Sequence, residues 1–317
     1  MSDLFLFLAQ VDDQIWTWLA APAILAIGLF LSVKFRFFQA RKFFKIFRDF
    51  IFTVQEGSKV PVRGVKPLQA FFTSIGGCIG IGNIVAVCTA IKIGGPGALV
   101  WMWLAAFLGM IIKYSEVYLG VLYRVPNGEG SYSGGPMYYL QKVFKGPFVP
   151  VLVALLIAFY GTEIYMFTVV TESISSNWEL DRVFIIPVLL ALVVTAGSGG
   201  VSRVGKICSF MIPALIVLYM FMCAFLLFSY KENIIPAFKV IFSSAFTGHA
   251  ATGGFLGSGL LLTLSQGVAR GCYSGDIGIG YASMIHAETS FSKPAKQAQM
   301  AILGIFLDTF VVCTATT

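Results

Sequence analysis

Four glycines and an asparagine fall within eight residues of a long apolar segment, in the stretch TSIGGCIGIGN that begins at Thr73. Glycine destabilises a helix interior by about 1 kcal/mol per position relative to alanine. This density predicts that the helix is interrupted, with the asparagine opening its second half. The residues concerned are Gly76, Gly77, Gly80, Gly82 and Asn83.

An interrupted helix inside a membrane has backbone groups without partners, which is tolerated only where they are buried in protein or line a cavity. The free N–H groups at the start of the second half suit a carboxylate, and the freed carbonyls suit a sodium ion. Many secondary transporters bind substrates and ions at such interruptions. The alternative is a tight helix–helix contact, because Gly76 and Gly80 have the GxxxG spacing.

A second glycine-rich stretch, TGHAATGGFLGSG, lies in the middle of an apolar segment of 35 residues, 234–268. That length exceeds the roughly 20 residues that one span needs. We expect a short outer helix, an interruption near 247–254 and a second helix from Phe255 to about Val268. The alternative is an outer re-entrant loop followed by one ordinary helix. The candidate binding residues here are Thr252, Gly253, Gly254 and Phe255.

Charged side chains within apolar segments are candidates for function. Glu163 lies in the middle of LIAFYGTEIYMF, where two interpretations are open: it faces a binding pocket together with Tyr160 and Thr162, or it is paired or protonated at an interface. Lys113 and Glu116 are three residues apart and share a helix face, which favours a structural pair near the cytoplasmic end.

The elements that must position these residues are membrane-spanning helices. Apolar residues make up 57% of the 317-residue chain and charged residues 12%, against about 25% charged residues in a soluble domain. Runs of about 20 apolar residues span a bilayer as helices, whereas barrel strands show short alternating runs. We predict eight segments: residues 16–33, 69–91, 98–122, 149–171, 183–197, 207–229, 234–268 and 300–317.

Basic residues alternate in density from loop to loop. The loops expected on one side hold seventeen, with nine between Lys34 and Pro67 and with Arg270 included, whereas the opposite loops hold four. The positive-inside rule then makes the basic loops cytoplasmic and places the N-terminus outside a bacterial inner membrane. The two glycine-rich segments cross in opposite directions, which points to an inverted repeat of five spans with the binding site between its halves.

The stretch from Gly80 to Arg124 resembles the alanine/glycine:cation symporters. The pattern of that family reads GxGNI, GGPGA, WMW, GM, K, E and YR, and every part is present in this order. GGPMYYL from Gly134 and LDTFVVCTAT from Leu307 also match. The resemblance extends from about residue 12 to the end of the chain.

This resemblance implies an all-α membrane protein with a leucine-transporter-like inverted repeat and one extra N-terminal helix. We expect a single transmembrane transporter domain, residues 1–317, with the extra helix at 16–33, the first five-helix repeat at about 69–229 and part of a second repeat at about 234–317. The resemblance also implies sodium-driven symport of alanine or glycine. A proton is the alternative coupling ion.

Two departures from the family pattern affect these expectations. Gly275 and Asp276 stand where the family has Asn and Glu, and Ser283 stands where it has Pro, which we interpret as a change at the cytoplasmic gate. The chain also reaches Thr317 within the expected second helix of the second repeat, so we expect that repeat to be incomplete. The alternative function is an inactive or half-carrier fragment, acting as a membrane scaffold, associating with itself or joining a second polypeptide that supplies the missing helices.

The first glycine-rich stretch has two roles in this hypothesis. The amino-acid carboxylate contacts N–H groups around Gly80, Gly82 and Asn83. Sodium, the co-transported ion, is bound by the carbonyls of Gly76 and Gly77 together with the Asn83 side chain.

The second stretch completes the expected pocket. Thr252, Gly253 and Gly254 meet the ammonium end of the substrate, Phe255 covers the pocket and Glu163 influences substrate preference. Sequence signatures of hydrolases, metalloproteases and nucleotide-binding enzymes are missing, so we expect a carrier and not an enzyme. Its partners are then alanine or glycine and the lipid bilayer, with no nucleic acid.

Overall fold

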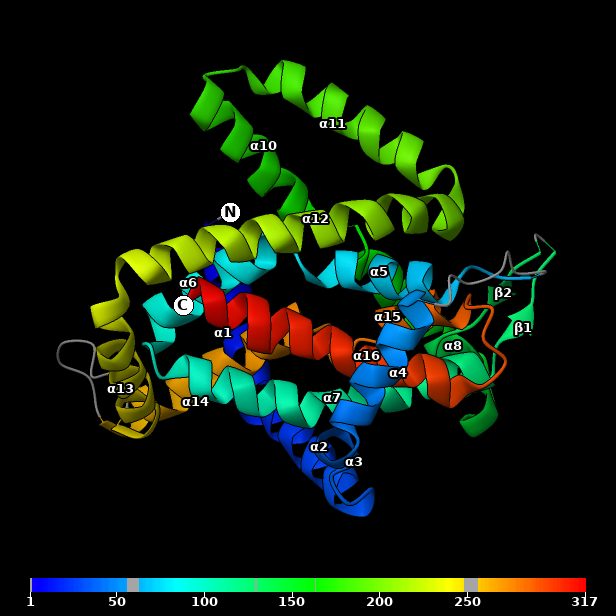
Figure 1. The fold of residues 1–317 in the computed structure, drawn as a ribbon, viewed down its shortest axis with the longest axis horizontal. Helices are drawn as coiled ribbons and strands as arrows, with labels where there is room; N and C mark the ends of the chain where they lie inside the picture. Colours follow the sequence, from blue (N-terminus) through cyan, green and yellow to red (C-terminus); the bar gives the residue numbers. More distant parts are fainter. Residues whose placement is uncertain (1, 56–62, 129, 163, 248–255) are drawn as a thin grey trace.

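The computed structural model describes residues 2–55, 63–128, 130–162, 164–247 and 256–317. Helices dominate the described part and surround α7 (Ala98–Leu122), which runs through the middle of the molecule (Figure 1). Gly109 of α7 allows a close approach, since an added Cβ would lie 2.3 Å from Cδ1 of Ile277. The helices packed against α7 include α2 (Ala21–Lys34), α14 (Leu256–Ser274), α15 (Tyr281–Ala287) and α16 (Pro294–Ile305).

The N-terminal segment forms a longer helix than the one predicted at residues 16–33. α1 (Ser2–Ile15), the π-helical turn η1 (Trp16–Ala20) and α2 follow one another directly, because the apolar residues ahead of Asp12 extend the helix. The Thr17 hydroxyl donates to the Ser265 hydroxyl at 3.0 Å and so attaches η1 to α14. α3 (Phe38–Arg41) and α4 (Phe43–Gln55) follow, and α4 packs against α16.

α5 (Pro67–Cys78) and α6 (Ile81–Gly94) form one spanning segment that is interrupted in its middle. Pro67 occupies the first helical position of α5, where an N–H has no intrahelical acceptor and its absence is tolerated. Gly95 follows α6 with a φ of 79°, a left-handed conformation that favours glycine. The chain thereby turns tightly from α6 into α7.

The chain between α7 and α12 (Gly200–Ser229) forms a short antiparallel ladder and several helices. α12 packs along α5, and α11 lies on the far side of α12 from α7 (Figure 1). The ladder pairs β1 (Val125–Pro126) with β2 (Tyr132–Ser133). The helices are α8 (Pro136–Val143), α9 (Phe148–Tyr160), α10 (Ile164–Trp178) and α11 (Arg182–Gly197). Farther along, α13 (Lys231–Thr247) precedes α14, and η2 (Phe306–Cys313) and α17 (Thr314–Thr316) continue α16.

Six segments of the described chain are long and apolar enough to cross a membrane, so the protein is a multi-pass helical membrane protein. They correspond to six of the eight predicted segments. A seventh, Arg182–Gly197, is a shorter apolar helix. The predicted segment 234–268 is divided between α13 and α14, and its expected interruption falls on residues outside the described part. The six segments are Leu6–Lys34, Pro67–Gly94, Ala98–Leu122, Phe148–Trp178, Gly200–Ser229 and Pro294–Thr316.

Arg124 joins several elements at the end of the molecule that carries β1 and β2. Its guanidinium lies 3.8 Å from the centroid of the Tyr132 ring. A planar guanidinium can bond several acceptors while stacking on a ring, so Arg124 holds the segment after α15 against the end of α7. The acceptors are the backbone carbonyls of Ala287, Thr289 and Phe291.

Candidate functional site

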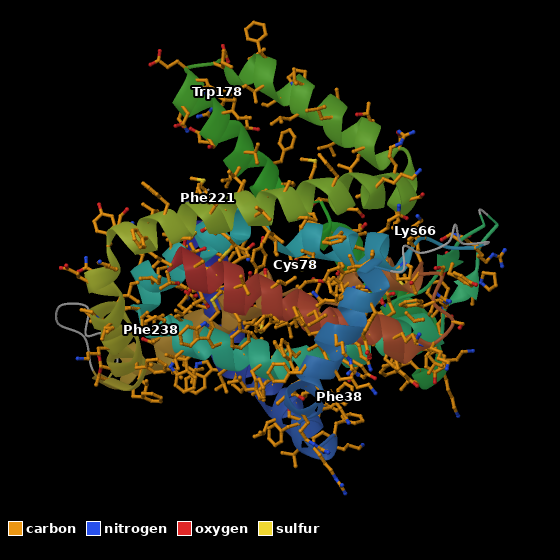
Figure 2. All side chains as sticks on the ribbon, viewed as in Figure 1. Phe38, Lys66, Cys78, Trp178, Phe221 and Phe238 are labelled. Atoms are coloured by element: carbon orange, nitrogen blue, oxygen red, sulfur yellow. The ribbon has the colours of Figure 1, made fainter. Side chains whose placement is uncertain are left out.

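The first interruption lies at residues 79–80, between α5 and α6. Gly80 is extended, with φ −174° and ψ −145°, and its N–H donates to Oδ1 of Asn83 at 2.8 Å. The predicted interruption is confirmed, but it is narrower than the glycine density suggested, because Gly76 and Gly77 belong to α5 and Gly82 belongs to α6. Figure 2 places Cys78, where α5 ends, near the centre of the molecule.

A second interruption, which the sequence pattern did not lead us to predict, separates α14 from α15 at residues 275–280. Asp276, Gly278 and Gly280 have φ of 50°, 83° and 88°. Oδ2 of Asp276 accepts a hydrogen bond from the N–H of Ala282 at 3.0 Å and so satisfies one of the free amides at the start of α15. A sequence signal for it exists: the tetrapeptide IGIG at residues 79–82 recurs at residues 277–280.

The two interrupted helices lie side by side in opposite directions. α14 packs against α6, and α15 packs against α5. The first half of one helix thus meets the second half of the other, so that the two chain directions are antiparallel. Figure 1 agrees, since α6 and α14 lie toward one end of the molecule and α5 and α15 toward the other.

A cavity of about 290 Å³ lies where the interruptions meet. Its walls come from both interrupted helices and from the junction of α9 and α10. Of the predicted binding residues, Gly76, Gly77, Gly80 and Gly82 line it, whereas Asn83 is fully buried outside its wall. The other lining residues are Cys78, Ile81, Tyr160, Gly161, Met166, Tyr273, Ser274, Asp276 and Tyr281.

Asp276 corrects our interpretation of the departure from the family pattern. We had assigned Gly275 and Asp276 to the cytoplasmic gate rather than to the pocket. Asp276 lines the central cavity and is only 3% exposed. The departure therefore lies in the wall of the central cavity, where Asp276 has the same carboxylate as the Glu of the family on a side chain shorter by one methylene.

A buried polar cluster, comprising Asn83, Ser274, Asp308, Thr309 and Cys313, lies behind the cavity. The Asp308 carboxylate is fully buried and accepts hydrogen bonds from Nδ2 of Asn83 at 2.7 Å, from the Ser274 hydroxyl at 3.0 Å and from the Thr309 hydroxyl at 2.9 Å. Asn83 also contacts the Cys313 sulfur at 3.2 Å. Ser274 lines the cavity, so one hydroxyl connects the cavity to the buried Asp308 side chain.

Lys113 was predicted to form a structural pair with Glu116, and that prediction is wrong. Among the described residues, an ion pair within 4.0 Å forms between Arg182 and Glu172, and none forms between Lys113 and Glu116. The Lys113 ammonium instead donates to the carbonyl of Gly275 at 2.7 Å and contacts the Cys78 sulfur at 3.4 Å. One side chain of α7 therefore contacts both interruptions.

Several predicted site residues lie outside the described residues. Glu163 is one of them, although its neighbours Tyr160 and Gly161 line the central cavity. The others are Thr252, Gly253, Gly254 and Phe255.

Arg270 does not belong with the basic loops in which we had counted it. It lies on α14 and lines a cavity of about 340 Å³ together with Gly82, Ala86 and Thr89 of α6. α6 and the basic segment ahead of α5 are on opposite sides of the first interruption. The count of seventeen basic residues in the loops that we expect to be cytoplasmic is therefore one too high, and the bias between the two sets of loops remains strong.

A helical membrane protein whose interrupted helices surround a small cavity is typical of secondary transporters. The chain belongs to the sodium:alanine symporter family, whose sequence profile matches residues 1–317. The resemblance seen in the motifs is thereby confirmed. Symport is the activity by which the family is named, which agrees with a carrier and with sodium as the transported ion.

Individual relatives agree with this assignment. The uncharacterized transporter YflA of Bacillus subtilis (strain 168) is 35% identical over 325 residues, which cover 100% of this chain and 67% of YflA. The sodium/alanine symporter AgcS of Methanococcus maripaludis is 32% identical over 96% of this chain and 68% of AgcS. The amino-acid carrier protein AlsT of Bacillus subtilis is 31% identical over 96% and 64%. The chain thus spans about two thirds of their length.

Proposed function

We propose that this protein couples sodium entry to the uptake of a small neutral amino acid, alanine or glycine, by alternating access across a bacterial inner membrane. The observation that carries the proposal is the cavity of about 290 Å³ at the meeting point of the two interruptions. Ligand pockets commonly measure about 300–1,000 Å³, so this cavity suits a small substrate. The family and the relative named as a sodium/alanine symporter support the ion and the substrate class.

The substrate carboxylate is bound at the start of α6. The first N–H groups of a helix have no intrahelical acceptor, and the helix dipole favours an anion there. Ile81 and Gly82 line the cavity at this position. The N–H of Gly80 already donates to Asn83, so Gly80 contributes space for the substrate rather than a hydrogen bond.

Sodium is bound beside the same interruption. The last carbonyls of a helix have no intrahelical donor, and Gly76 and Gly77 at the end of α5 line the cavity. Oxygen ligands suit a hard cation. Asp308 supplies a negative charge next to these carbonyls through Ser274, and Asn83 orients the Asp308 carboxylate.

The substrate ammonium faces the second interruption, where Asp276 offers a carboxylate in the wall of the cavity. Charge-assisted hydrogen bonds of this kind are stronger than neutral ones. The remaining candidates for this side of the pocket stay predictions from the sequence: Glu163, Thr252, Gly253, Gly254 and Phe255.

The two interrupted helices are equivalent parts of an inverted repeat. Their antiparallel packing and the recurrence of IGIG support this arrangement. The first repeat comprises α5 to α12, and the second begins at α14, near residue 256 rather than at 234. The density of basic residues supports an N-terminus outside the membrane.

Uptake of labelled alanine into proteoliposomes that contain the purified chain tests the proposal. An inward sodium gradient should drive accumulation, and replacing sodium with choline should abolish it. Gly82→Leu should reduce uptake to the level of empty liposomes, because even a Cβ at Gly82 would lie 3.3 Å from Cε of Met166.

Gly146→Leu is the matched control, since a Cβ at Gly146 has no neighbour within 4 Å, and it should transport like the parent. Alanine uptake that does not depend on the sodium gradient would overturn the proposed coupling of sodium entry to alanine uptake. Full uptake by Gly82→Leu would exclude the start of α6 as the carboxylate site.

A further inference from the structure

A separate cavity of about 250 Å³ lies between the N-terminal helix and α14. Asp12 and Asp13 of α1 line one side of it, and Arg270 of α14 lines the other. The hydrogen bond from Thr17 to Ser265 holds the two helices together beside this cavity. Opposite charges therefore face each other across a space that two attached helices define.

The polar groups of this cavity are not satisfied by one another. Nε of Arg270 and Oε1 of Gln266 are buried without a hydrogen-bond partner, and Gln266 is only 7% exposed. Neither Asp12 nor Asp13 comes within the 4.0 Å of Arg270 that defines an ion pair among the described residues. Buried polar groups are normally hydrogen-bonded, so a polar ligand in the cavity would satisfy both atoms.

The charge arrangement selects the chemistry of that ligand. A simple anion is attracted by Arg270 but repelled by the two carboxylates, and a simple cation has the opposite difficulty. An α-amino acid carries an ammonium and a carboxylate at once, and each finds an opposite charge here. Charge-assisted hydrogen bonds to both ends favour such a zwitterion over either ion alone.

The cavity is also connected to the central site through shared residues. Arg270 and Tyr273 line both this cavity and the neighbouring one of about 340 Å³. Gly82 and Tyr273 line both that neighbour and the central cavity. A ligand at Asp12 and Asp13 would therefore lie at the outer end of a row of cavities that leads to the first interruption.

We infer that Asp12, Asp13, Gln266 and Arg270 form an entry site that binds the zwitterionic amino acid before it reaches the central cavity. The inference rests on the proposed function, because it takes the same substrate class. It assigns a role to the extra N-terminal helix, which supplies the acidic wall. The carboxylates of Asp12 and Asp13 and the side-chain oxygen of Gln266 bind the ammonium of the amino acid. The guanidinium of Arg270 binds its carboxylate.

Equilibrium binding of labelled alanine to the purified full chain in detergent tests this site. Gly82→Leu blocks the central cavity, and we expect this variant to retain a weaker, saturable binding of alanine. Asp12→Asn/Asp13→Asn in the same background should remove the remaining binding, and so should Arg270→Gln. The control substitution Glu179→Gln/Glu232→Gln removes two other acidic groups and should leave the remaining alanine binding unchanged. Propionate and ethylamine, which each carry one charge of alanine, should compete poorly.

The outcomes separate this inference from the proposed function. If the parent binds alanine but Gly82→Leu binds none, the entry site is wrong and the central site stands. Binding by Gly82→Leu that survives both the double acidic substitution and Arg270→Gln also overturns the entry site. If the parent itself binds no alanine, both proposals fail. Thermal melting of each variant ensures that a loss of binding is counted only for folded protein.

Discussion

The Asp308 carboxylate accepts most of the hydrogen bonds in the polar cluster behind the central cavity. It is fully buried, and the donors Asn83, Ser274 and Thr309 surround it. A buried carboxylate needs such donors or a cation. Because Ser274 also lines the cavity, a sodium ion there would lie next to a negative charge that the protein has already oriented.

Replacing this charge should weaken sodium coupling. Asp308→Asn is expected to raise the sodium concentration for half-maximal alanine binding about tenfold or more, which corresponds to about 1.4 kcal/mol. The measurement is a sodium titration of labelled alanine binding. Thr309→Ser keeps the donated hydroxyl and should titrate like the parent. An unchanged titration for Asp308→Asn would remove Asp308 from the sodium site.

Sequence alone indicated one wall of the site and, in Asn83, one member of the polar cluster behind it. Glycine density is a local property, so Gly76, Gly77, Gly80 and Gly82 could be recognised within a single window. The bond between Asn83 and Asp308 joins residues 225 positions apart, and only folding brings them together. Asp276 was misinterpreted because its stretch, rich in glycine and poor in apolar length, looks like a loop outside the membrane.

At the scale of elements, α7 connects the two interruptions through Lys113. Its ammonium contacts the Gly275 carbonyl in one interruption and the Cys78 sulfur at the edge of the other. The carbonyl is the stronger acceptor, because a thiol sulfur accepts only weakly. We therefore expect the bond to Gly275 to dominate the contribution of Lys113 to stability.

Lys113→Met should lower the free energy of unfolding by about 1.5–3 kcal/mol, the usual contribution of a hydrogen bond to a charged group. Thermal melting in detergent measures the difference. Cys78→Ala removes the weaker contact and should change the melting temperature much less. Equal effects of the two substitutions would contradict the assignment of the Gly275 carbonyl as the main partner.

Helices were easier to predict than their interruptions. Long apolar runs in the sequence correspond to the spanning segments because a bilayer imposes their length. The second interruption is set by backbone conformation at Asp276, Gly278 and Gly280, all with positive φ. Its position could have been found by comparing the two IGIG tetrapeptides. Hydropathy alone left residues 269–299 as a loop between two predicted segments, so α15 was not predicted.

At the scale of the whole molecule, the charge distribution predicts which face meets the cytoplasm. α12 has 30 residues, which as a helix span about 45 Å, so its two ends should lie on opposite sides of the membrane. A membrane-impermeant maleimide applied to intact cells should label Lys231→Cys, just beyond α12, and should not label Arg203→Cys near its start. The unsubstituted chain gives the background labelling. The reverse pattern would invert the proposed orientation.

The bond between Lys113 and Gly275 also has a consequence for biogenesis. The two residues are 162 positions apart, and translation at about 5–20 residues per second delays the acceptor by about 8–30 s. During that interval α7 has reached the insertion machinery with an ammonium that costs about 2.5–3.5 kcal/mol at the centre of a spanning helix. The apolar residues of α7 offset this cost during insertion, but the ammonium obtains its carbonyl acceptor only when Gly275 arrives, so the final packing of α7 is completed late in the assembly of the protein.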